Sequence, residues 1–125
     1  MEEITKGGTM PEKAVNQQLN TAKSTACKIL IDAGYKIERA NNQTFCLTAG
    51  RNSEWRVIAV GTKPIIKCPW FIEQVKRLEK YPCPDSNVIQ KEVWIRGEGE
   101  HTFRQFVWKD SQWFDENLEP ADIFN

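Results

Sequence analysis

The chain lacks any long hydrophobic run. No stretch of its 125 residues approaches the roughly 18 consecutive apolar residues that a membrane-spanning helix needs. Residues 1–10 are charged and contain no apolar segment of the kind found in signal peptides. We therefore expect a soluble, cytoplasmic protein with no membrane role.

Histidine is nearly absent and the cysteines are widely spaced. The only histidine is His101, in a Glu-rich segment, and no two of the four cysteines lie within about ten positions of each other. Structural zinc sites are built from closely spaced Cys and His pairs, so this spacing predicts no metal site and no cofactor. We expect all four cysteines to be reduced thiols, as in a reducing compartment.

Net charge is also lacking, because the 17 Lys and Arg residues balance the 17 Asp and Glu residues. The chain as a whole is therefore not drawn toward nucleic acid or an anionic membrane, and binding to either would need a local basic patch. Hydrophobic residues make up 40% of the chain and aromatic residues 10%, which is enough for one folded core.

The hydrophobic pattern predicts one α/β domain. Apolar residues recur every three or four positions from Val15 to Ala33, which indicates an amphipathic helix that ends at Gly34. Further elements are expected as strands at 35–40, 44–49 and 55–61, a helix at 70–80, and strands at 88–96 and 102–109. The middle of 55–61 is apolar on both faces, which predicts a central strand with a helix on each face of a mixed sheet. We divide the chain into a flexible leader (1–10), the domain (11–109) and a C-terminal tail (110–125).

This αβββαββ order resembles the restriction-endonuclease-like, or PD-(D/E)xK, nuclease superfamily, which includes Holliday-junction resolvases. The local sequence pattern is similar as well, because a helix leads into Asp32-Ala33-Gly34-Tyr35-Lys36-Ile37-Glu38. The strands around 45–47, 55–61 and 91–95 follow at distances typical of that superfamily. The resemblance covers about residues 15–109. Double-stranded RNA-binding domains share part of the order, but they carry a lysine cluster where this chain has Cys68-Pro69-Trp70-Phe71.

The resemblance implies catalytic positions, and in this chain they are degenerate. Active members use an acidic residue on the second strand and an acidic-x-lysine on the third, which bind Mg²⁺ and activate a water molecule. Those positions correspond to Cys46, Ala59 and Gly61 here. Alanine and glycine offer no metal ligand, and a thiol is a poor ligand for Mg²⁺.

The alternative is an active enzyme, a Mg²⁺-dependent endonuclease whose catalytic site has migrated to other residues. Its candidates are Glu38, Glu54 and Lys63, although solvated charges at strand ends explain these residues better. In the resembled fold Arg51, Lys63 and Lys67 lie in loops near the substrate cleft, so they are the candidate nucleic-acid-binding residues.

The last third of the chain is rich in aromatic residues, namely Trp94, Phe103, Phe106, Trp108, Trp113 and Phe114. Such residues fill a core, stack on unpaired bases or bind a partner protein. The resulting hypotheses are a non-catalytic nuclease-fold protein that binds DNA, RNA or protein, an active nuclease with a migrated site, and a protein-interaction module with no nucleic-acid role.

Overall fold

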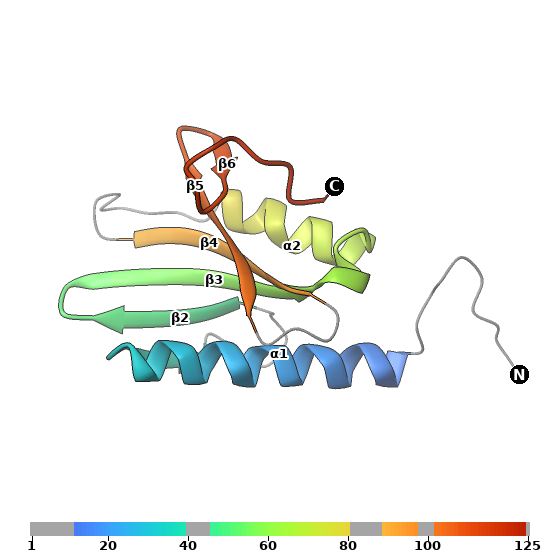
Figure 1. The fold of residues 1–125 in the computed structure, drawn as a ribbon, viewed down its shortest axis with the longest axis horizontal. Coiled ribbons are helices and arrows are strands. Elements are labelled where there is room, and N and C mark those ends of the chain that lie inside the picture. Colours follow the sequence, from blue (N-terminus) through green and yellow to red (C-terminus); the bar gives the residue numbers. More distant parts are fainter. Residues whose placement is uncertain (1–11, 40–45, 81–88, 98–101, 125) are drawn as a thin grey trace, which may run out of the picture.

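The computed structural model describes residues 12–39, 46–80, 89–97 and 102–124, so the expected leader at 1–10 lies outside the described residues. They form a six-stranded mixed sheet with a helix on each face (Figure 1). The elements in chain order are α1 (Glu12–Asp32), β1 (Lys36–Arg39), β2 (Cys46–Arg51), β3 (Glu54–Thr62), the short 3-10 helix η2 (Lys63–Ile65), α2 (Pro69–Glu79), β4 (Ile89–Arg96), β5 (Phe103–Lys109) and β6 (Gln112–Phe114).

The strands lie in the sheet in the same order as in the chain, β1-β2-β3-β4-β5-β6. Only β3 and β4 are parallel; their connection passes through α2, and every other neighbouring pair is antiparallel. β3 therefore has a hydrogen-bonded strand on each side, which confirms the predicted interior position of 55–61.

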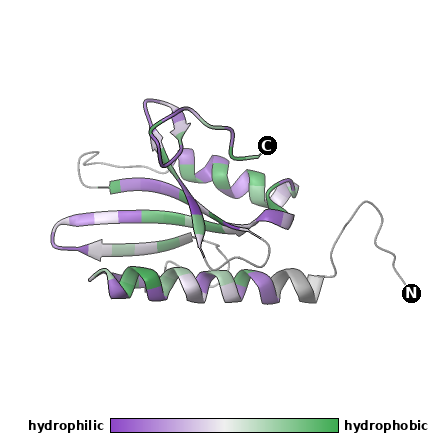
Figure 2. Cartoon of the chain, in the orientation of Figure 1, coloured by the Kyte–Doolittle hydropathy of each residue, from purple (hydrophilic) through white to green (hydrophobic). Residues whose placement is uncertain are grey.

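The sheet is buried on both faces because β3 alternates two sets of apolar side chains. Ile58 and Val60 belong to the cluster under α1, whereas Val57 and Ala59 belong to the cluster under α2. β3 is hydrophilic where it begins and hydrophobic through its middle (Figure 2). A strand that is apolar on both faces requires cover on both, and the two helices supply it.

α1 buries one stripe on the sheet and ends in a glycine cap. Its buried residues are Leu19, Ala22, Ala26 and Leu30. Gly34 has φ +94°, its N–H donates to the carbonyl of Ile31, and the N–H of Tyr35 donates to the carbonyl of Leu30. This pair of bonds is a Schellman motif, and it turns the chain directly into β1.

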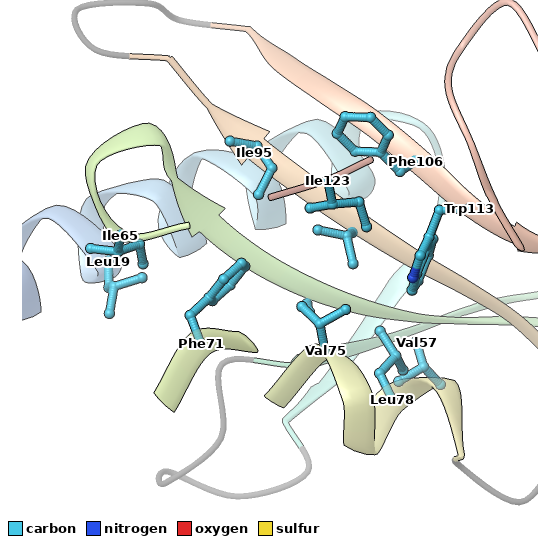
Figure 3. Close-up of a cluster of buried hydrophobic side chains, with 12 residues drawn as sticks. Leu19, Val57, Ile65, Phe71, Val75, Leu78, Ile95, Phe106, Trp113 and Ile123 are labelled. Carbon is cyan, nitrogen blue, oxygen red and sulfur yellow. The ribbon is translucent and has the colours of Figure 1, made fainter. Parts of the chain in front are cut away.

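On the other face, α2 buries Phe71, Val75 and Leu78 against the sheet (Figure 3). Pro69 occupies the first turn, where its missing N–H is not needed. These three side chains are spaced three and four positions apart, so they share one face of the helix expected at 70–80.

The segment after β5, expected as a tail, contributes a strand and core residues. Asp110 and Ser111 have φ of 51° and 61°, and they form the two-residue turn that pairs Lys109 with Gln112. Trp113 of β6 and Ile123 are both buried in the cluster under α2 (Figure 3). β6 is not evident from sequence patterns because the strand is three residues long and Asp-Ser is not one of the usual turn pairs.

Candidate functional site

The positions that the nuclease resemblance marks as catalytic do lie together. Cys46 of β2 and Ala59 of β3 are direct partners in the register, and Gly61 follows on the same face of β3. This is the face covered by α2. The side chain of Cys46 lies outside the described residues.

The space in front of Gly61 is filled by Phe71 of α2. A Cβ atom added to Gly61 would lie 2.6 Å from Cζ and 2.7 Å from Cε1 of the Phe71 ring. Both Phe71 and Ala59 are fully buried. A lysine at position 61 would have to displace this ring, and a carboxylate at 59 would lie in the same buried apolar cluster, so the residues present do not fit a Mg²⁺ ion there. Within the described ranges, no three His, Cys, Asp or Glu side chains come together as a metal site.

The residues proposed for a migrated site are not brought together. Glu54 begins β3 and Lys63 follows its end, and nine strand steps of about 3.3 Å separate them by roughly 30 Å. Glu38 pairs with Thr48 on the α2 face, whereas Glu54 lies on the α1 face. In this structure Glu38, Glu54 and Lys63 therefore do not form one site.

The three candidate nucleic-acid-binding residues are also divided between the two ends of the sheet. Arg51 donates from Nη1 to the carbonyl of Ala33 at 2.9 Å, and its guanidinium lies 4.5 Å from the centre of the Tyr35 ring. Arg51 thus holds the end of α1 against the sheet. Lys63 and Lys67 lie at the opposite end, between β3 and α2.

A small pocket with two cations opens where the parallel strands β3 and β4 end. Lys63 comes from η2, and Arg104 comes from β5, where it is the register partner of Ile95. Both side chains are exposed, and no acidic residue is among the described residues that line the pocket. In open α/β sheets, ligands bind preferentially at the carboxyl ends of parallel strands.

The rest of the pocket wall is mainly apolar. Ile66, Ile95, Phe106 and Ile123 line it, and the last three lie beside one another in Figure 3. The guanidinium of Arg104 lies 5.2 Å from the centre of the Phe106 ring, a cation–π contact that orients it at the pocket. The volume is about 110 Å³. Such a site can hold a small anion between two positive charges.

A second polar cluster lies on the α1 face, and no sequence pattern indicates it. The carboxylate of Glu92 on β4 is only 1% exposed, and Arg56 on β3 donates to it from both Nε and Nη2. Gln90 Nε2 and Trp94 Nε1 complete its hydrogen bonding at 2.7 and 2.8 Å. Because every position of the carboxylate is used by a donor, we interpret this cluster as structural.

The guanidinium of Arg56 is also held by an aromatic ring, since it lies 5.1 Å from the centre of Tyr35. Burial lowers the pKa of Arg56, but the hydrogen bond and charge of Glu92 outweigh it, with a smaller contribution from Tyr35, so the pKa is raised. Arg56 therefore stays charged. Sequence spacing gave no signal for its pairing with Glu92, because the two residues are 36 positions apart.

Most of the aromatic residues of the C-terminal third fill the core. Trp94, Phe103, Phe106 and Trp113 are buried, and Trp108 packs on Trp113 with ring centres 5.0 Å apart. Among the described residues they do not form an exposed aromatic surface. A protein partner for this third of the chain stays a prediction.

The sequence matches no protein-family model, and neither the curated proteins nor the solved structures provide a significant match. None of the described helices is long and apolar enough to cross a membrane.

Proposed function

We propose that this chain is a non-catalytic relative of the restriction-endonuclease-like nucleases and that it binds nucleic acid through phosphate. The topology supports the fold assignment. A helix leads into the antiparallel meander β1-β2-β3, and a second helix then crosses over to β4, which is parallel to β3. The two helices lie on opposite faces, as the resemblance implies (Figure 1).

The observation that carries the non-catalytic part is the packing of Phe71 on Gly61. Catalysis in the resembled family requires two carboxylates and a lysine around a hydrated metal ion. The corresponding volume here is filled by apolar side chains, with Ala59, Val75 and Phe71 fully buried around it. A polar site at this place would require different side chains at the buried positions of α2.

The binding part rests on Lys63 and Arg104. The phosphate backbone is recognised mainly by Lys and Arg, and arginine matches phosphate oxygens with two parallel hydrogen bonds. These two cations flank a pocket with no described acidic residue, which gives the local basic site that a chain of zero net charge requires.

The catalytic test uses branched, single-stranded and plasmid DNA incubated with the protein and Mg²⁺ or Mn²⁺. We expect no cleavage above a blank without protein. Cleavage that is lost in Glu54→Ala or Glu38→Ala would instead establish the migrated-site nuclease and overturn the proposal.

The binding test is fluorescence anisotropy with labelled DNA and RNA over a salt series. We expect affinity to fall as salt rises, and we expect Lys63→Ala and Arg104→Ala each to weaken binding and to reduce the salt slope by about one. Lys28→Ala, an exposed lysine of α1 far from the pocket, removes the same charge and is the matched control. Absence of binding at low salt would refute the proposal and favour the protein-interaction module.

A further inference from the structure

The size of the Lys63–Arg104 pocket restricts what can enter it. Its volume is about 110 Å³, which is enough for a small anion or a few water molecules. A terminal phosphate group can enter such a space with its free oxygens first, whereas an internal phosphate brings a sugar on each side to the mouth of the pocket. The wall residue Ile123 is buried and belongs to the core cluster, so widening the pocket would disturb packing.

The charge of the pocket adds a second restriction. An internal phosphodiester carries one negative charge, whereas a phosphate monoester carries about −1.5 to −2 at pH 7. Two cations from separate elements, Lys63 after β3 and Arg104 on β5, match the monoester better.

We infer that the pocket binds a terminal phosphate monoester, so that the protein recognises phosphorylated ends of nucleic acid in preference to internal positions. The terminal group protrudes from the chain end and is bonded to only one sugar. It can therefore enter the pocket while the nucleic acid stays outside. This inference rests on the proposed function and specifies the substrate class of the same site.

The experiment compares three internally labelled oligonucleotides of one sequence, which carry a 5′-phosphate, a 3′-phosphate or hydroxyls at both ends. We expect one or both phosphorylated probes to bind at least about ten-fold more tightly than the hydroxyl probe, because the monoester gains charge-assisted hydrogen bonds. Inorganic phosphate should displace the preferred probe more effectively than sodium chloride of equal ionic strength.

Variants distinguish binding in this pocket from general electrostatic attraction to the protein. In Lys63→Ala and Arg104→Ala the preference for phosphorylated ends should fall toward one-fold, whereas Lys28→Ala should keep the full ratio. Both pocket side chains are exposed, so we expect the variants to fold, which circular dichroism checks.

The outcomes also distinguish the two proposals. Equal, salt-dependent affinity for all three probes would overturn the end-recognition inference and leave nucleic-acid binding intact. If none of the probes bound at low salt, the inference and the proposed function would both fail. A preference that survived in both pocket variants would place the phosphate elsewhere and also overturn the inference.

Discussion

The indole Nε1 of Trp113 donates a hydrogen bond to Oε2 of Glu79 at 2.8 Å, and this bond joins β6 to the last turn of α2. The two residues are 34 positions apart in the chain. Lys91 Nζ adds a bond from β4 to the carbonyl of Glu79 at 2.7 Å. The end of α2 is thus held both by the sheet and by the segment that follows β5.

Trp113→Ala should lower the free energy of unfolding by about 3–5 kcal/mol, because it empties a buried aromatic position. Urea denaturation followed by circular dichroism measures this change. Leu118→Ala lies in the same segment but is 71% exposed, and we expect a change within about 0.5 kcal/mol. Equal urea midpoints for both variants would show that the segment does not stabilise the fold.

Gly61→Ala should destabilise the protein by about 1–3 kcal/mol, since the new methyl group overlaps the buried ring of Phe71. Removing that ring relieves the overlap. A double-mutant cycle with Phe71→Ala should therefore show less destabilisation than the sum of the single changes. Strict additivity in urea denaturation would contradict this contact.

Arg56→Ala should cost about 3–5 kcal/mol, because it leaves the buried carboxylate of Glu92 without its charged partner. The raised pKa of Arg56 means that the contribution of this pair is present below the ordinary arginine pKa and is lost only as the pH rises through the raised value. The effect of the mutation should therefore be the same at pH 6 and pH 9 in denaturant unfolding. Glu73 and Arg77, an exposed pair on α2, provide the control, and Arg77→Ala should cost no more than about 0.5 kcal/mol.

Ile58→Asp should unfold the domain, because it places a charge in the fully buried middle of β3 under α1. Loss of the cooperative thermal transition would be the expected result. Lys36→Asp, at an exposed position of β1, should keep the transition close to that of the parent protein. A folded Ile58→Asp variant would show that the α1 face is not the buried core described above.

The sequence predicted most of the described elements because each has a local pattern. α1 and α2 follow apolar stripes of helical period, and β3 is recognisable from its run of buried residues. The strand expected at 44–49 extends further than predicted, since β2 continues through Gly50 and Arg51. Gly50 pairs with Trp55 across the strands, and the Trp55 ring covers the position where a Cβ atom of residue 50 would lie. A glycine in the sequence does not by itself reveal this cross-strand contact.

The candidate site was less predictable because it depends on long-range register. Lys63 was singled out from the sequence, but its neighbour Arg104 comes from β5, and only the pairing of β4 with β5 brings it to the pocket. The pairing of Arg56 with Glu92 likewise depends on the parallel register of β3 and β4. Patterns along one segment contain no information about either contact.

The two ends of the described sheet are built from its shortest strands. β1 has four residues, three of them charged, and β6 has three residues and is followed by a bridge from Phe114 to Pro120. Exposed strand edges recruit strands from other molecules, and short length, charge and proline all oppose this. Self-association by sheet extension is therefore disfavoured at both edges, and concentrated samples should resist fibril formation as long as β1 and β6 stay in place.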